Sequence, residues 1–179
     1  MAFPIKPPVK PQLALSRKVL PEGEGWAYEP KYDGFRAIAF VDGEKVYLQS
    51  RGAKPLLRYF PEISFPKGRY VLDGEIVPDN DSFNTLGQRI HPAESRIARL
   101  AEETPTHFVA FDLLAFEDDV VMDLPFEQRR ALLLAALGGR TAREIGEIEA
   151  IPVGTAKTRI RSGLLRVRDT LAEDEVPRG

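Results

Sequence analysis

The sequence predicts an α+β fold, with an antiparallel sheet in the first part of the chain and an all-helical tail after it. The sheet is indicated by apolar runs at 37–41 and 45–48 that flank Asp42-Gly43, a strong two-residue hairpin signal. The tail is indicated by a Leu- and Ala-rich run at 125–137 and by apolar residues at three- and four-residue steps between 156 and 171. That spacing is the period of an amphipathic helix.

The start of the chain predicts an extended segment. Its first twelve residues contain four prolines: Pro4, Pro7, Pro8 and Pro11. Proline disfavours a helix interior, so we expect a strap that lies over a domain surface. From Trp26 to Ser50 the pattern is typical of β structure, with the hairpin at its centre.

One Asp-Gly pair, at 73–74, lies inside an apolar run, so residues 70–77 are predicted to form one continuous strand. Glycine inside a strand often marks the close approach of a ligand or another backbone. Residues 82–103 predict two short helices broken at His91-Pro92, because proline is tolerated at a first helical position. A strand is expected at 106–114.

The second half of the chain predicts mainly helices. Residues 118–123 are expected to form an acidic loop, and the helix at 125–137 to end at Gly138-Gly139. We divide the chain into a sheet-containing domain at 1–123, a helical domain at 124–172 and a disordered tail at 173–179.

Composition limits the class of protein. With 179 residues and 43% hydrophobic content, the chain is long enough for a packed core. We expect a cytoplasmic protein with no membrane partner, because no apolar run approaches the roughly 20 residues of a membrane span and the start lacks the apolar region of a signal peptide. The absence of cysteine excludes disulfides, thiolate zinc sites and cysteine nucleophiles.

The net charge of −2 is distributed unevenly. Residues 1–123 hold 15 Lys and Arg against 19 Asp and Glu, a balance of −4, and residues 124–179 hold 10 against 8, a balance of +2. Because a nucleic-acid partner is usually matched by a positive face, the tail is the better candidate for contact with DNA.

Lys31, in the stretch KYDGFR at 31–36, is the candidate catalytic residue. A lysine amine attacks phosphorus or carbonyl centres only when it is unprotonated, and its reference pKa of about 10.4 opposes this near neutrality. Cationic neighbours and desolvation favour the neutral amine, and Arg36 and Arg51 are candidate neighbours. The alternative is a solvated lysine beside a surface turn, because Asp-Gly before an apolar run also predicts a hairpin.

The stretch KYDGFR is one of several short sequence blocks that follow one another in the order found in a known family. KYDGFR closely resembles the nucleotidyl-transfer motif KxDGxR of ATP-dependent DNA ligases, with WAYEP before it and three blocks after it: SRGAK at 50–54, VLDGEIV at 71–77 and FVAFDLLAF at 108–116. The phrase QRIHPAESR at 88–96 resembles the small bacterial ligase type. The resemblance covers residues 1 to about 137, and it implies a truncated nucleotidyltransferase domain that uses ATP and acts in DNA repair.

The resemblance implies a role for each matching residue. Lys31 would attack the α-phosphorus of ATP to form a lysyl-AMP, and Glu29 would seat the adenine or its ribose from the same strand face. Arg36 and Arg51 would bind phosphate or ribose oxygens. The last two residues are Glu75, which would bind the ribose hydroxyls or a metal ion, and Phe111, which would stack on the adenine.

Each role has a structural alternative. Glu29, Arg36 and Arg51 could be exposed charges, Glu75 the polar face of a strand, and Phe111 part of the core, as most strand phenylalanines are. Mg²⁺ is expected with the triphosphate rather than from a motif. His91 and His107 are interpreted as helix-end and strand-end residues, because two histidines without paired spacing make no metal site.

The ligase pattern stops before its later blocks. No EGxVxK or KxK block follows, and neither does the β-barrel domain; after Phe111 the sequence contains one lysine, Lys157. In the ligase family, the lysines of the missing KxK block hold the α-phosphate. Loss of one preorganised donor to a developing oxyanion costs about 3 kcal/mol. We therefore expect weak or lost self-adenylation and no independent nick sealing.

The tail resembles a second family. Residues 124–171, and IPVGTAKTRIR at 151–161 above all, resemble the helix-turn-helix of sigma-factor region 4, which reads the −35 promoter element. The apolar stripe expected for its last helix is Ala156, Ile160, Leu164, Val167 and Leu171. Five basic residues occur from 157 to 168, and a helix of this kind can enter a major groove. The candidate DNA-binding residues are Thr155, Lys157, Thr158, Arg159 and Arg161.

Two departures are visible in this tail. Ala150 occupies a turn position where such modules often use glycine, at a cost of about 1 kcal/mol if φ is positive. Glu149 replaces a commonly apolar position. The alternative for the whole segment is an amphipathic helix that docks on its own domain.

The leading hypothesis is an ATP-dependent DNA ligase-like nucleotidyltransferase joined to a DNA-binding helix-turn-helix. The competing hypothesis is a transcription-type DNA-binding protein whose ligase-like half is an inactive scaffold, and a third is a gene-fusion remnant. An RNA ligase or capping-type transferase would share the lysine motif. The expected partners are DNA, and either RNA polymerase or a protein that supplies the missing ligase elements.

Overall fold

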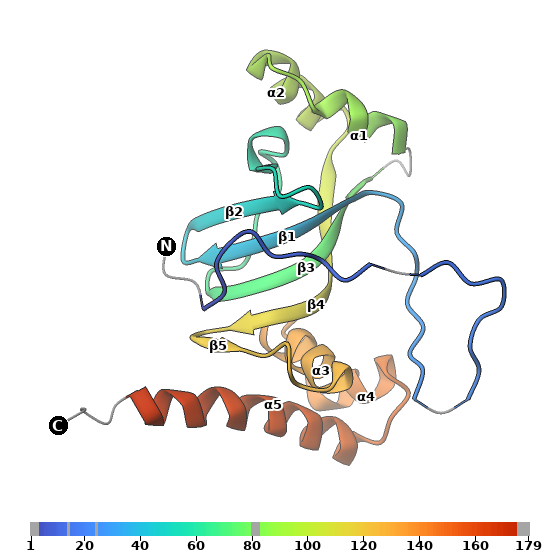
Figure 1. The fold of residues 1–179 in the computed structure, drawn as a ribbon, viewed down its shortest axis with the longest axis vertical. Helices are drawn as coiled ribbons and strands as arrows, with labels where there is room; N and C mark the ends of the chain where they lie inside the picture. The colour runs from blue at the N-terminus through green and yellow to red at the C-terminus, as the bar shows by residue number, and fades with distance from the viewer. Residues whose placement is uncertain (1–3, 14, 24, 80–82, 175–179) are drawn as a thin grey trace.

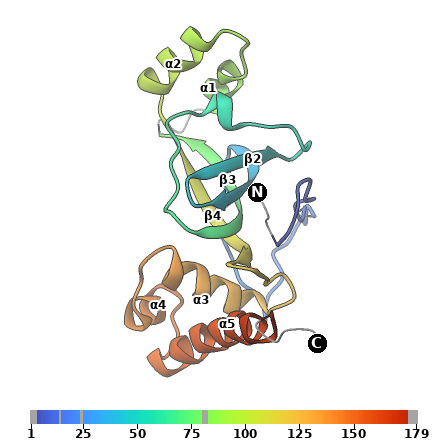
Figure 2. The ribbon, with the colours of Figure 1, turned by 90° about the vertical axis from the view of Figure 1, so that its left-hand side faces the viewer.

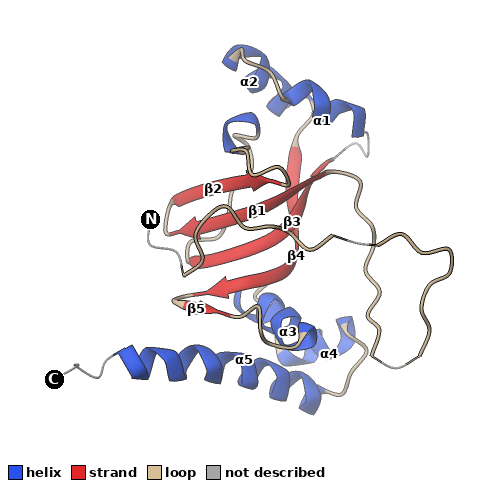
Figure 3. Cartoon of the chain, in the orientation of Figure 1, coloured by secondary structure: helices blue, strands red, loops and turns tan. Residues whose placement is uncertain are grey.

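The computed structural model describes residues 4–13, 15–23, 25–79 and 83–174, with side chains placed as far as residue 165 in the last helix. The fold is α+β, with five antiparallel strands in the order β2-β1-β3-β4-β5. The strands are β1 (Phe35–Asp42), β2 (Lys45–Ser50), β3 (Arg69–Pro78), β4 (Thr106–Phe116) and β5 (Asp119–Val120). The helices are α1 (Phe83–Arg89), α2 (Glu94–Glu103), α3 (Phe126–Ala136), α4 (Ala142–Ile148) and α5 (Val153–Asp174), with a 3-10 turn η1 (Leu57–Tyr59) after β2. Figures 1 and 3 show the sheet in the middle of the molecule, and Figure 2 shows α1 and α2 at one end of it and α3, α4 and α5 at the other.

The hairpin predicted around Asp42-Gly43 is confirmed. Asp42 pairs with Lys45, and Gly43 takes the positive φ of 65° that this two-residue turn requires. The continuous strand through Gly74 is also confirmed, since β3 spans it. A Cβ at Gly74 would lie 2.4 Å from the ring of Phe108 on β4, so the close approach of β4 requires glycine here.

Two stretches differ from the sequence prediction. Trp26 was expected to begin β structure, but β1 begins only at Phe35, and the residues before it form an exposed loop. Pro30 in this loop has no N–H to donate to a strand ladder. The acidic segment 118–123 was expected to be a loop, but it includes the short edge strand β5, which pairs with the end of β4.

The N-terminal strap is present. Val9 exchanges two hydrogen bonds with the amide of Gln49 on β2, at 2.9 and 2.6 Å. Ile5 and Val9 pack against buried residues on one face of the sheet, among them Phe40 and Leu114. The larger core lies against the opposite face, where side chains of η1, α1 and α3 cover the strands.

A buried arginine joins the two short helices to the sheet. Arg89, at the end of α1, is 0% exposed. Its guanidinium donates to the carbonyls of Tyr59, Leu100 and Thr104 and pairs with Glu62 at 2.7 Å. Glu62 in turn accepts from the hydroxyl of Thr106 at 2.7 Å. The helices predicted on either side of His91-Pro92 are thus fixed by one buried charge.

The helical tail packs on the sheet domain rather than standing apart from it. Arg129 of α3 forms a bidentate pair with Asp112 of β4, with both N–O distances 2.8 Å, and it also donates to the carbonyl of Leu124 at 2.6 Å. Helix α5 lies against α3 and α4. Among the residues the structure describes, no helix is long and apolar enough to span a membrane.

The buried face of α5 differs in part from the predicted stripe. Ala156 is buried and Ile160 half-buried, as expected, but Leu164 is 45% exposed. Gly163 takes the inward position instead, where its Cβ direction meets Leu132 of α3 at 3.4 Å. The side chains of Val167 and Leu171, the last two residues of the predicted stripe, lie outside the described residues. The tail at 173–179 was expected to be disordered, but residues 173 and 174 belong to α5, and residues 175–179 lie outside the described residues.

Replacing Ala150 by glycine is expected to stabilise the tail by up to about 1 kcal/mol. Ala150 joins α4 to α5 with a φ of 51°, in the left-handed region that disfavours a Cβ. Urea unfolding of Ala150→Gly measures the gain. The matched control is Ala135→Gly inside α3, which should lower stability by about 1 kcal/mol, because a helical glycine gives up more backbone freedom. A loss of stability in both variants would contradict the strain at 150.

Candidate active site

Lys31 lies in the exposed loop that leads into β1. Its side chain is 90% exposed, and its Nζ lies 4.0 Å from Oδ1 of Asp33, which is itself 77% exposed. The sequence predicted cationic neighbours and a partly closed pocket for this lysine. In this structure the amine faces solvent beside a carboxylate.

The loop is joined to the sheet at Gly34. The Gly34 N–H donates to Oε1 of Glu75 on β3 at 3.2 Å. A Cβ at Gly34 would lie 2.2 Å from the carbonyl oxygen of Ile76, so this contact with β3 requires glycine. Burial raises the pKa of the Glu75 carboxyl, and the charges of Arg36 and Lys31 oppose that shift. Glu75 is therefore bonded to the backbone of the loop that carries Lys31.

An open hollow of about 280 Å³ lies beside Gly34, between the start of β1 and the turn that follows β2. The turn is tight: Ser50 Oγ accepts from the N–H of Lys54 at 2.9 Å, and Ala53 has a φ of 60°. The hollow is lined by Gly34, Phe35, Arg36, Ser50, Arg51, Gly52 and Leu56. Two predicted binding residues, Arg36 on β1 and Arg51 in the turn after β2, thus line one cavity.

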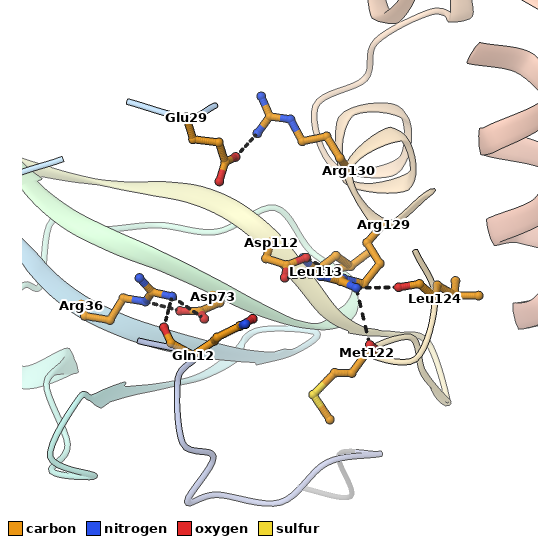
Figure 4. Close-up of polar contacts among 10 residues, drawn as sticks. All are labelled: Gln12, Glu29, Arg36, Asp73, Asp112, Leu113, Met122, Leu124, Arg129 and Arg130. Carbon is orange, nitrogen blue, oxygen red and sulfur yellow. Dashed lines mark hydrogen bonds and ion pairs between the residues drawn. The ribbon is translucent and has the colours of Figure 1, made fainter. Parts of the chain in front are cut away.

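Arg36 is already paired. Its guanidinium makes a bidentate contact with Asp73 of β3, at 2.6 and 2.8 Å, and also donates to the carbonyl of Gln12 on the strap at 3.4 Å (Figure 4). The same guanidinium lies 4.4 Å from the centre of the Phe111 ring, a cation–π contact. The face of Phe111 that was expected to stack on adenine is therefore in contact with Arg36.

Charged residues that the sequence analysis missed connect this site to the tail. Asp73 lies within the DGE block at 73–75, where only Glu75 was assigned a role. Burial raises the pKa of Asp73, and Arg36 opposes the rise. Asp112 pairs with Asp73 in register across β3 and β4 and is neutralised by Arg129. Arg129 and Arg130 follow one another in the RR pair of α3, and that pair of like charges was the available signal.

Glu29 contacts the tail rather than the hollow. Its Oε1 lies 3.3 Å from Nη1 of Arg130. Figure 4 draws this contact between the loop and α3. Arg130 also donates through Nε to Glu149, the C-cap residue of α4, at 3.1 Å. Burial raises the pKa of Glu29, and the Arg130 charge opposes that rise. Glu149, which occupies a position that is commonly apolar in such modules, is half-buried in this ion pair.

The histidines occupy the ends of secondary structure, as expected. Nδ1 of His91 accepts from the N–H of Ala93 at 3.1 Å, just before α2, and Nδ1 of His107 lies 2.6 Å from Asp79 near the start of β4. Within the described residues there is no group of three or more His, Asp or Glu side chains that could hold a metal ion. Glu75, the residue predicted as a metal ligand, belongs to no such group among those residues.

The candidate DNA-binding residues lie on the first turns of α5. Thr155, Lys157, Thr158 and Arg161 are exposed, whereas Arg159 is half-buried. Lys157 and Arg161 also border an open groove of about 480 Å³ between α4 and α5, with apolar walls at Ala142 and Ile160. Four of the five predicted residues are thus accessible to a ligand.

Comparison with known proteins places these features in a family context. The family described as ATP dependent DNA ligase domain matches residues 11–161, past the point near 137 where the resemblance was expected to end. DNA ligase C of Mycobacterium tuberculosis is 46% identical over 164 residues, which cover 87% of this chain and 45% of that protein. DNA ligase C2 of Mycolicibacterium smegmatis is 49% identical over 146 residues, covering 76% of this chain and 40% of that protein.

A solved structure titled mycobacterial DNA ligase D complexed with ATP and MES is similar at a TM-score of 0.44 and 26% identity, covering 61% of this chain and 36% of that one. The chain spans less than half of the length of the two curated relatives that it matches here.

Proposed function

The chain belongs to the ATP-dependent DNA ligase family, and from that premise we propose that it is a nucleotidyltransferase in which Lys31 accepts AMP from ATP. The observation that carries the proposal is the cavity lined by Gly34, Arg36 and Arg51: the Gly34 N–H donates to Glu75, and Lys31 lies three residues earlier in the same loop. Arginine side chains suit the oxygens of a phosphate chain, and both of these arginines line the cavity.

The proposed step is a displacement at the α-phosphorus of ATP. The unprotonated Nζ of Lys31 forms the N–P bond, the bond from that phosphorus to the bridging oxygen breaks, and pyrophosphate leaves. Arg51 offsets negative charge on the phosphate oxygens. Glu75, whose carboxylate accepts from the Gly34 N–H, would also accept from the ribose hydroxyls.

We expect this step to be slow in the chain as it stands. The side chain of Lys31 is 90% exposed and lies beside Asp33, so the attacking amine is open to solvent rather than enclosed in a pocket. In addition, Arg36 covers Phe111 and is paired with Asp73. An adenine could stack on that face of Phe111 only after Arg36 moved away, and breaking a bidentate pair opposes that movement.

Mg²⁺ does not fit as a resident cofactor. The described residues offer no cluster of three or more acids or histidines around Glu75. Any metal would therefore arrive with the triphosphate as part of the substrate, where it neutralises phosphate charge. The test of the function is incubation of the whole chain with ATP labelled in its α-phosphate: label that stays on the denatured chain supports a covalent AMP, and label that washes away overturns it.

A second candidate, DNA binding by the tail, is favoured by the exposed cations on α5. The α4–α5 unit would act as a helix-turn-helix, joined at Ala150 with the positive φ that the tight connection needs. In the transcription-type form of this proposal the sheet domain is a scaffold, and RNA polymerase is a partner. In the ligase form DNA is the substrate, and a partner protein completes the phosphate site.

Replacing Lys157 and Arg161 by alanine is expected to weaken duplex DNA binding about equally for all sequences. Each lost phosphate contact should also lower the slope of log K against log salt by about 1. Filter binding of the full chain over a salt series measures both quantities. Lys67→Ala, an exposed lysine in the turn before β3, is the matched control. Equal binding by the double variant and the control would remove the tail as a DNA-binding element.

A further inference from the structure

Arg130 connects the loop that carries Lys31 to the helical tail. On one side it contacts Glu29, two residues before Lys31, and on the other it contacts Glu149 at the end of α4. Its own side chain is 24% exposed, so these contacts are partly shielded from solvent. Residues 25–33 of the loop are otherwise exposed, and Trp26 and Tyr28 are each 59% exposed. The Glu29–Arg130 pair therefore supplies the loop with a contact outside its own residues.

The segment around Lys31 has two attachment points. One is the Glu29–Arg130 pair, on α3, and the other is the hydrogen bond from the Gly34 N–H to Glu75, on β3. Four residues lie between Glu29 and Gly34, and each residue extends the chain by at most about 3.6 Å, so the Lys31 Cα lies within about 7 Å of the Glu29 Cα and about 11 Å of the Gly34 Cα. If the Glu29–Arg130 pair were broken, the Gly34–Glu75 hydrogen bond would still hold the loop after Lys31, but the contact before Lys31 would be lost.

The charges around Arg130 make it the necessary member of this contact. Glu29 and Glu149 share one guanidinium, and the charge of Glu149 acts on Glu29 as a repulsion. A neutral residue at 130 would leave two carboxylates near one another and convert an attraction into a repulsion. A neutral residue at 149, in contrast, would remove the repulsion and leave Arg130 to Glu29.

We propose that Arg130 is a positioning residue for Lys31, through which the helical tail holds the lysine-bearing loop in place. The inference deepens the proposed function and rests on it: Arg130 contacts neither the lysine nor the cavity, and it acts by fixing Glu29. The tail is then part of the nucleotidyltransferase site, whatever else it binds.

The experiment compares Arg130→Gln, Arg130→Lys and Glu149→Gln with the whole wild-type chain, and Arg143→Gln, an exposed arginine on α4, is the matched control. Trp26 is the single tryptophan of the sequence and lies three residues before Glu29, so its fluorescence anisotropy decay reports on the loop without a label. Arg130→Gln should increase the local motion of Trp26. Glu149→Gln and Arg143→Gln should not, and Arg130→Lys should restore part of the order, because lysine keeps the charge but not the planar fork.

The second measurement is the single-turnover rate of covalent AMP formation. Arg130→Gln should lower the rate at saturating ATP on the order of tenfold or more, because misplacement of a reacting group by about 1 Å has effects of this size. The ATP concentration for half-maximal rate should change by less than about threefold, since ground-state contacts to ATP remain. If Arg130 only stabilised the fold, Arg130→Gln would lower the free energy of unfolding without selectively lowering the labelling rate at saturating ATP.

The outcomes separate the two proposals. A wild-type chain that takes no label overturns the proposed function, and the Trp26 measurement then decides the Arg130 contact by itself. Unchanged Trp26 motion in Arg130→Gln overturns the contact. Increased motion with an unchanged labelling rate overturns the positioning of Lys31 while leaving the nucleotidyl transfer intact.

Discussion

The chain with Lys31 replaced by alanine forms no covalent AMP when it is incubated with ATP and Mg²⁺. Lys31 supplies the attacking nitrogen, and removal of a nucleophile leaves only binding, so a loss of about 10³-fold or more is expected. Lys31→Arg should be equally inactive, because a guanidinium stays charged and cannot attack. It nevertheless keeps a positive charge at the site. The two variants together separate loss of the nucleophile from loss of charge.

Lys54→Ala is the matched control for this prediction. Lys54 is an exposed lysine in the turn beside the hollow, and its backbone N–H, which the substitution retains, bonds to Ser50. Label on the denatured chain is measured by gel, and the modified residue is located by mass spectrometry of its peptides. Labelling of Lys31→Ala at the wild-type level would assign the adduct to another residue and end the case for Lys31.

The parts of the fold that the sequence predicted are those fixed by local chemistry. The Asp42-Gly43 hairpin follows from one turn, and the two helices around His91-Pro92 follow from one proline. Residues 26–34 have the aromatic content of a strand, but a strand also needs hydrogen-bonding neighbours, which composition does not reveal. Similarly, the contact with Leu132 of α3 determines which face of α5 is buried. Gly163 therefore faces inward and Leu164 does not.

The candidate site was predicted by residue type but not by pairing. Arg36, Arg51 and Glu75 do lie around one end of β1, yet the partners of Arg36 and Glu29 are Asp73 and Arg130. Such pairs join residues 37 and 101 positions apart, so they exist only once the sheet and the tail have been assembled. Sequence spacing carries no information on contacts of that range.

Replacing Arg89 by methionine is expected to lower the free energy of unfolding by about 3–5 kcal/mol. Methionine fills much of the same volume, but it leaves the Glu62 carboxylate and the carbonyls of Tyr59 and Leu100 without their shared donor. Since a domain of this kind is stable by about 5–15 kcal/mol, the loss is a large part of the total. Urea unfolding measures it, and Arg99→Ala, which breaks an exposed pair on α2, should cost less than about 0.5 kcal/mol.

The penalty should come from the carboxylate left alone rather than from lost packing. If so, Glu62→Gln in the Arg89→Met background recovers part of the stability, because a neutral amide is less costly to bury and still accepts from the Thr106 hydroxyl. Should Arg89→Met not fold, Arg89→Lys keeps the charge and provides an intermediate that can be measured. A double variant that is no more stable than Arg89→Met would show that packing of the Arg89 side chain and α1 against Phe60, not the buried charge, accounts for the effect.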